Sequence, residues 1–148
     1  MHKKRVACVV CGDKFTTTHP KYLTCSKKCR DVNKVNRRYQ RMNNDWIAYF
    51  KHLLSKKKDS PLTVDQLIYK VAEQNYKCAL SGRELTCIRV RGKVIQTNAS
   101  IDRIHAGKEY NYDNIQIVCR AVNSFRGNME VEEFIFWCKE VANYGVCK

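Results

Sequence analysis

Four of the nine cysteines in this 148-residue chain have the spacing of metal ligands. Cys8 and Cys11 form one close pair, and Cys25 and Cys29 form a second pair after an intervening loop. Two such pairs suit the tetrahedral coordination of Zn²⁺, which thiolates hold in closed structural sites. Gly12 permits the tight turn that follows the first pair. Because residues 1–30 hold little apolar material, we expect Zn²⁺ to supply the free energy that folds them.

A disulfide scaffold is the competing interpretation of so many cysteines. The odd number of cysteines and the lack of an apolar stretch behind the basic N-terminus both argue against export and disulfide formation. No apolar run has the length of a membrane-spanning helix. We therefore expect a cytoplasmic protein that does not enter the membrane.

The positive charge of the chain is concentrated in its first part. The formal net charge is +14. Residues 1–58 contain sixteen lysines and arginines against three acidic residues, whereas residues 59–148 contain twelve against eleven. Such a field attracts a polyanion, so nucleic acid is favoured over a solubility charge or a membrane-surface role.

Several helices are expected to position these groups. A basic helix is predicted over residues 30–42, followed by a second helix or a continuation from Trp46, and another helix from a capping box at Thr63 to about Asn75. Residues 86–97 suggest a hairpin that turns at Gly92. A last helix, from Glu130 to a stop at Gly145, is expected to close the core with the apolar residues Phe134, Ile135, Cys138, Val141 and Ala142.

The segment from Ser100 to Arg126 predicts a strand, a loop, a second strand at Ile115–Val118 and a helix that starts near Cys119. Its pattern is Asp-Arg-Ile, then Tyr-x-x-x-Asn-Ile-Gln-Ile-Val-Cys, then Asn-x-x-Arg. This segment resembles the HNH (ββα-metal, or His-Me finger) endonuclease family, especially phage-type members and some rare-cutting restriction enzymes. The resemblance covers residues 76–140, and a four-cysteine zinc knuckle before such a finger is also familiar in that family.

The resemblance assigns roles to residues in this segment. Asp102 and the helix residue Asn123 would hold one catalytic Mg²⁺ or Mn²⁺, a hard ion that prefers oxygen ligands and acts as a Lewis acid on the phosphate. Asn114 would brace the loop through backbone hydrogen bonds without touching the metal. Arg126 shares a helix face with Asn123, so it is predicted to contact phosphate, with an ordinary surface charge as the alternative.

The general base is not settled by the sequence. Family members usually have histidine directly after the metal-binding aspartate, whereas this chain has Arg103, which cannot accept a proton but can clamp a phosphate. Members with arginine there recruit a tyrosine from the following loop, and Tyr110 lies at the matching position. His105 is the alternative base, because its ordinary pKa suits proton transfer near neutral pH.

A second zinc site is common in HNH domains, between two Cys-x-x-Cys pairs. Here Cys78 is paired with Ser81, and Cys119 is paired with Val122, so two of the four ligands are missing. Cys87 or Cys138 could replace them. We favour the interpretation that these cysteines pack as small apolar side chains.

Together these features predict an α+β fold with two regions. Residues 1–58 would form a zinc knuckle with basic helices, and residues 59–148 a ββα-metal finger with packing helices. The predicted function is a metal-dependent DNA endonuclease of the homing, nicking or restriction type, phage-encoded and acting in the bacterial host. The alternatives are a catalytically inactive zinc-dependent nucleic-acid-binding protein and, less favoured, an RNA nuclease. Cutting both strands would require a homodimer or successive nicks. The residues predicted to contact DNA phosphates are Lys34, Arg37, Arg38 and Arg41, besides Arg126.

Overall fold

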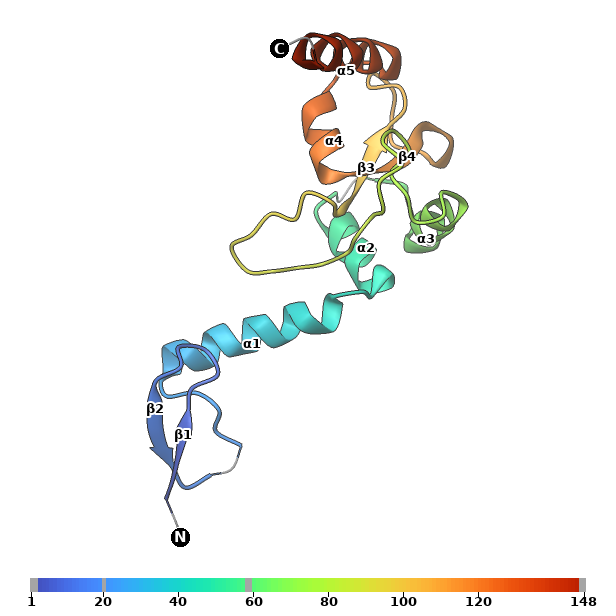
Figure 1. The fold of residues 1–148 in the computed structure, drawn as a ribbon. Helices are drawn as coiled ribbons and strands as arrows, with labels where there is room; N and C mark the ends of the chain where they lie inside the picture. The colour runs from blue at the N-terminus through green and yellow to red at the C-terminus, as the bar shows by residue number, and fades with distance from the viewer. Residues whose placement is uncertain (1–2, 20, 58–59, 147–148) are drawn as a thin grey trace.

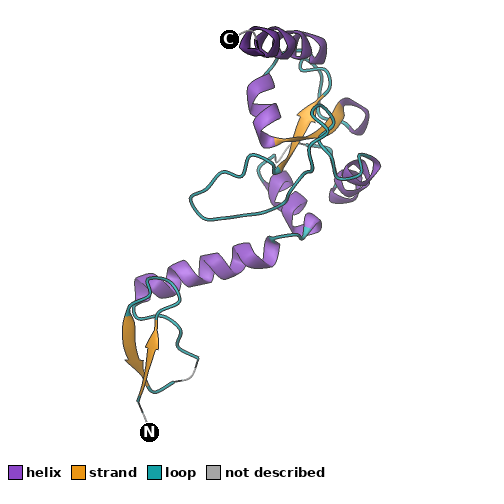
Figure 2. Ribbon diagram, viewed as in Figure 1, coloured by secondary structure: helices purple, strands orange, loops and turns teal. Residues whose placement is uncertain are grey.

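The computed structural model describes residues 3–19, 21–57 and 60–146. Within them the fold mixes helices with two small antiparallel sheets (Figures 1 and 2). The elements, in chain order, are β1 (Lys4–Ala7), β2 (Lys14–Thr17), α1 (Lys27–Met42), α2 (Trp46–Ser55), α3 (Val64–Glu73), β3 (Ala99–Arg103), the 3₁₀ helix η1 (Tyr112–Asn114), β4 (Ile115–Cys119), α4 (Arg120–Arg126) and α5 (Val131–Val146).

The N-terminal part is a hairpin followed by a long helix. β1 and β2 pair antiparallel, with Lys4 opposite Thr17 and Ala7 opposite Lys14. The basic helix α1 begins at Lys27, three residues before the predicted start, and ends at Met42. Figure 1 shows the hairpin and α1 extending away from the remaining elements. Of the described side chains before residue 43, Cys8 alone is buried, so apolar packing contributes little to this part.

The hydrophobic core lies where α2, α3 and the β3–β4 sheet meet. Phe50 of α2, Leu67 and Val71 of α3, and Ile117 of β4 are completely buried. Each contributes about 1.5–3 kcal/mol relative to an exposed side chain. Phe50 belongs to this core although α2 precedes residue 58, the boundary expected between the two regions.

The starts of α2 and α3 are both fixed by side-chain caps. The Asp45 carboxylate accepts a hydrogen bond from the Ala48 backbone N–H, which makes α2 a separate helix. The capping box predicted at Thr63 is confirmed, because Thr63 and Gln66 each accept a hydrogen bond from the other's backbone N–H. These caps satisfy amide groups that would otherwise lack a partner.

The structure corrects two expectations about secondary structure. Residues 86–97 form no hairpin of regular strands; within them a single antiparallel bridge joins Val90 to Lys93. The last helix, α5, continues through Gly145 to Val146 and does not close the core. Phe134 is its one buried side chain among the described residues, whereas Ile135, Trp137 and Val141 are exposed, because α5 lies against the body near its first turn alone. No described helix is both long and apolar enough to cross a bilayer.

Candidate zinc and phosphodiester-cleavage sites

The four N-terminal cysteines are brought together as the sequence predicts. Their sulfur atoms all lie within 4.8 Å of one another. The Sγ atoms of Cys11 and Cys25 are 3.5 Å apart, and those of Cys25 and Cys29 are 3.7 Å apart. A tetrahedral Zn²⁺ with bonds of about 2.3 Å separates its sulfur ligands by roughly 3.8 Å. The cluster is therefore compatible with structural zinc.

A tight turn at the first cysteine pair prepares this site. The Cys8 backbone N–H donates to the Asp13 carbonyl at 2.9 Å, and the Gly12 N–H donates to the Cys8 carbonyl at 2.9 Å. Gly12 has φ of 80°, which glycine adopts without strain. The Cys11 backbone N–H is the largest of the influences that lower the pKa of Cys8 to about 6. A lowered pKa favours the thiolate, the form that binds metal.

The same turn recurs at Cys78 with half of the metal ligands missing. Cys78 N–H donates to the Arg83 carbonyl at 2.8 Å, and Gly82 N–H donates to the Cys78 carbonyl at 2.9 Å. Burial raises the pKa of Cys78, but hydrogen bonds from the Ser81 side chain and the Cys119 backbone outweigh it, so the net direction is downward. Among the described residues, the N-terminal cluster is the single group of three or more potential ligands close enough to share a metal.

The second candidate site is built where β3, β4 and α4 meet. β3 and β4 pair antiparallel, with Asp102 opposite Gln116, and α4 begins directly after β4. The strands predicted here and the helix near Cys119 are confirmed. Asp102 lies next to the last residue of β3, and Asn123 lies in the middle of α4. The strand pairing and the short β4–α4 junction therefore carry both residues to one place.

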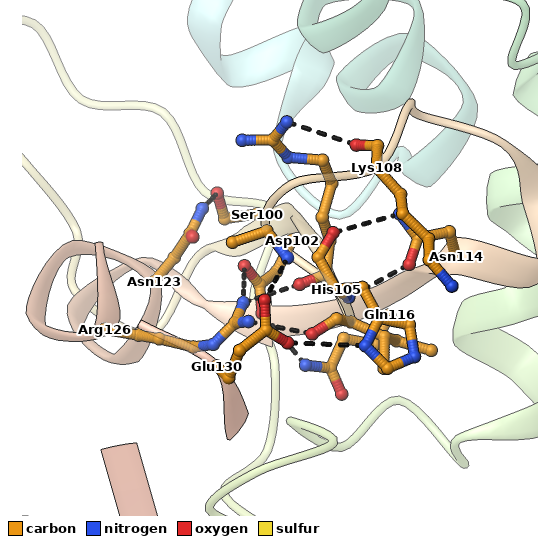
Figure 3. Close-up of polar contacts among 12 residues, drawn as sticks. Ser100, Asp102, His105, Lys108, Asn114, Gln116, Asn123, Arg126 and Glu130 are labelled. Atoms are coloured by element: carbon orange, nitrogen blue, oxygen red, sulfur yellow. Dashed lines mark hydrogen bonds and ion pairs between the residues drawn. The ribbon is translucent and has the colours of Figure 1, made fainter. Parts of the chain in front are cut away.

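Asp102 and Asn123 line the same pocket, which has a volume of about 430 Å³. The Asn123 amide nitrogen donates to the Ser100 hydroxyl at 2.6 Å, which leaves the amide oxygen as an acceptor (Figure 3). The pocket is also lined by Arg103, Tyr110 and Arg120. The carboxylate of Asp102 and the amide oxygen of Asn123 thus lie beside open space. Oxygen ligands of this kind fit a hard cation that retains several waters.

Arg126 differs from its predicted role as an exposed phosphate contact. Its side chain is 1% exposed, and its Nη1 forms an ion pair with Asp102 Oδ1 at 2.6 Å (Figure 3). Nη1 also donates to the Arg103 carbonyl at 2.6 Å, and Nη2 donates to the Ile104 carbonyl at 2.9 Å. Arg126 thus fixes the end of β3 through its two terminal nitrogens, whereas its buried Nε has no hydrogen-bond partner among the described residues.

The second oxygen of Asp102 accepts a hydrogen bond from Gln116 Nε2 at 2.9 Å. Both carboxylate oxygens are therefore engaged, but each retains a second lone pair for a cation. The positive charge of Arg126 opposes that of a divalent ion, so the pair with Asp102 lowers the affinity that this carboxylate offers to a metal.

The Asn114 side chain forms the loop-bracing hydrogen bonds that the resemblance leads us to expect. Its Oδ1 accepts from the His105 backbone N–H at 2.9 Å, and its Nδ2 donates to the carbonyls of His105 and Glu109 at 3.2 and 2.9 Å. Asn114 is 5% exposed and is not among the residues that line the pocket. Its place in a catalytic finger stays a prediction.

The two candidate bases lie in different surroundings. Tyr110 lines the pocket, with the Lys57 ammonium 3.5 Å and the Arg103 guanidinium 5.0 Å from its ring centre. His105 Nδ1 lies 3.3 Å from Glu130 Oε2, and the same carboxylate accepts from the Ala106 N–H at 3.0 Å (Figure 3). His105 does not line the pocket. The geometry thus favours Tyr110 over His105.

The basic helix presents its charges to solvent. Lys34, Arg37 and Arg38 of α1 are exposed, and they border a hollow of about 950 Å³ that also contacts the loop at Tyr22. The side chain of Arg41, the fourth residue predicted to contact phosphate, lies outside the described part of the chain.

Sequence reasoning missed three residues that shape the site. Gln116 could have been found by pairing the two predicted strands, because it stands opposite Asp102. Glu130, which holds His105, and Lys57, which covers Tyr110, come from distant segments. No local spacing in the sequence signals either of these contacts.

Comparison of the chain with protein-family models, with curated proteins and with solved structures gave no match. The HNH resemblance thus stays a prediction that rests on the residues themselves.

Proposed function

We propose that this chain is a metal-dependent DNA endonuclease of the HNH type, in which β3, β4 and α4 form the ββα-metal finger. The observation that carries the proposal is the convergence of Asp102 and Asn123 on one pocket that also contains Arg103 and Tyr110. An oxygen pair for a hard cation, a phosphate-binding guanidinium and a proton acceptor are the groups that phosphodiester hydrolysis requires.

In this proposal each side chain of the pocket has one task. Asp102 and Asn123 hold Mg²⁺ or Mn²⁺, which supplies Lewis-acid stabilisation of the phosphate when bound. Arg103 binds the scissile phosphate through its guanidinium and orients it. Tyr110 Oη, as the tyrosinate, accepts the proton of the attacking water. The Lys57 ammonium and the Arg103 guanidinium lie 3.5 and 5.0 Å from the centre of its ring.

Zinc and the basic helix serve substrate binding. The four-cysteine cluster has no open ligand position for chemistry, because closed thiolate sites are structural. Lys34, Arg37 and Arg38 contact DNA phosphates, which positions the duplex without reading its sequence.

The test is a plasmid-nicking assay with Mg²⁺ or Mn²⁺. We expect the wild type to nick and Asp102→Asn to lose activity by about a hundredfold or more, since a carboxylate ligand is removed. Asn keeps the shape of Asp102, and a thermal melt checks that the protein remains folded. Asp113→Asn, an exposed aspartate on η1, is the matched control and should retain wild-type activity.

A second candidate function is a zinc-dependent nucleic-acid-binding protein without catalysis. The ion pair between Asp102 and the buried Arg126 favours it, because a cation must compete with a fixed guanidinium. DNA binding without any metal-dependent nicking by the wild type would support this second function and reject the first.

A further inference from the structure

Three surface hollows share lining residues and so follow one another along the protein. The catalytic pocket and a hollow of about 450 Å³ beside α2 are both lined by Arg120. That second hollow and a third of about 510 Å³ beside α1 are both lined by Arg89 and Val90. The third hollow reaches Asn36 and Gln40 of α1. A connected surface thus leads from the pocket to the basic helix.

The lining of this surface is almost entirely basic or neutral. Lys56, Arg91, Lys93 and Arg120 are exposed. Neither of the two hollows beyond the catalytic pocket has an acidic residue in its lining. In the catalytic pocket the acidic side chain is Asp102, which is paired with Arg126. A surface with this sign of charge attracts phosphates.

The imidazole of His52 lies within the same group of cations. It lines the hollow beside α2. Burial lowers the pKa of His52, and the charges of Arg89, Lys56 and Arg38 lower it further. Cations from α1, from the C-terminal cap of α2 and from the loop after Cys87 therefore surround this one imidazole.

The loop that carries Arg91 and Lys93 is held at its base. The Asn98 side chain accepts from the Ile88 N–H at 2.9 Å and donates to the Ile88 carbonyl at 2.6 Å. The Arg89 N–H donates to Asn43 Oδ1, between α1 and α2, at 2.7 Å. Figure 1 shows this loop projecting between α1 and β3. A fixed loop can position two cations without a large loss of entropy on binding.

We propose that these three hollows form a single path for the DNA backbone, which leaves the catalytic pocket over Arg120, crosses the loop tip at Arg91 and Lys93, and reaches α1. The inference rests on the proposed function, because it takes DNA as the substrate. It adds a phosphate-binding surface outside the finger and outside α1. On this path the loop of residues 88–95 joins the site to the basic helix.

The experiment measures the affinity of the full-length zinc-loaded protein for a 20-base-pair DNA duplex at several salt concentrations without divalent metal. The variant is Arg91→Ala with Lys93→Ala. The matched control is Arg83→Ala with Lys77→Ala, which removes the same two charge types from exposed positions that line none of the three hollows. All four side chains are exposed, so both variants are expected to fold.

We expect the loop variant to bind the duplex about tenfold more weakly near 0.1 M salt. The plot of log K against log salt should also become less steep by about 1.8, since each lost phosphate contact removes about 0.9 from the size of its negative slope. The control should keep the wild-type affinity and slope. Equal behaviour of the two variants would overturn the proposed path while leaving the nicking test of the function untouched. Conversely, a wild type that binds through the loop but never nicks would overturn the function and retain the path.

A second readout follows His52 by NMR. Bound phosphates offset the surrounding cations, so the pKa of His52 should rise when the duplex is added to the wild type. The loop variant should show a smaller rise. A His52 titration curve that the duplex leaves unchanged would contradict the path.

Discussion

The two ends of this molecule are stabilised by different means. In residues 1–42, twelve lysines and arginines face two acidic residues, and Cys8 is the one buried side chain among those described. From α2 onward a continuous cluster of apolar side chains holds the fold, and it positions Asp102 and Asn123. The comparison teaches that a strongly basic part can be built around a four-cysteine cluster with little apolar packing, whereas the residues of the candidate site are positioned by a packed core.

Removing zinc gives the largest expected effect. Because apparent binding free energies of structural zinc are about 10–16 kcal/mol, a strong chelator should unfold the hairpin and weaken DNA binding while the core remains folded. Amide NMR spectra resolve the two parts, and Cys11→Ser should reproduce the effect. Cys138→Ser, an exposed cysteine outside the cluster, is the control. Spectra unchanged by the chelator would contradict the comparison.

A truncation in the core should affect the other end. Phe50→Ala removes a completely buried ring and should cost about 3–5 kcal/mol in the free energy of unfolding. Phe125→Ala, which removes a ring that is 73% exposed, should cost far less. Denaturant titration measures both. Equal losses would mean that the core is not what stabilises this part.

Two arginines sharpen the contrast between the ends. Arg126→Met leaves Asp102 buried without its partner and should cost about 3–5 kcal/mol of stability. Arg37→Ala, on the exposed face of α1, should change the free energy of unfolding by less than about 0.5 kcal/mol. It should make the plot of log K for DNA against log salt less steep by about 0.9. Thermal melts and binding titrations on both variants separate the two roles. An Arg126 variant as stable as the wild type would refute the structural role.

The smallest expected effect is a pH dependence from His52. The pKa of His52 is lower in the folded state than in the unfolded chain, where it is about 6.5. Its contribution to stability is therefore fully present above about pH 6.5 and is lost as the pH falls from there through the folded-state pKa, because the unfolded chain then binds the proton more readily. His52→Gln should reduce the loss of melting temperature between pH 7.5 and 5.5. A variant whose pH dependence matched that of the wild type would exclude His52 as the cause.

Local patterns in the sequence predicted most of the regular elements and the cysteine cluster. The Thr63 capping box, the strand around Asp102 and the zinc-ligand spacing depend on residues near one another in the chain, and short-range chemistry determines them. The ion-pair partner of Asp102, Arg126, was not predictable in this way. Arg126 has the same spacing from Asn123 whether it faces solvent or the core, and tertiary packing alone decides between these.

The apolar stripe of α5 shows the converse limit. Ile135 and Val141 have the helical spacing of core residues, yet they are exposed because no described element covers that face. Periodicity identifies which face of a helix is apolar, but it does not establish that a neighbour covers it.

The most direct test of the central claim is the binding of Mn²⁺, followed by electron paramagnetic resonance, to the zinc-loaded protein with duplex DNA present. We predict one Mn²⁺ per chain in the wild type, with binding weakened at least tenfold both in Asp102→Asn and in Asn123→Ala, because each variant loses one oxygen ligand. Asp113→Asn should bind as the wild type does. Mn²⁺ binding that is absent from the wild type, or unaffected by both substitutions, would contradict the claim that these two side chains share a cation.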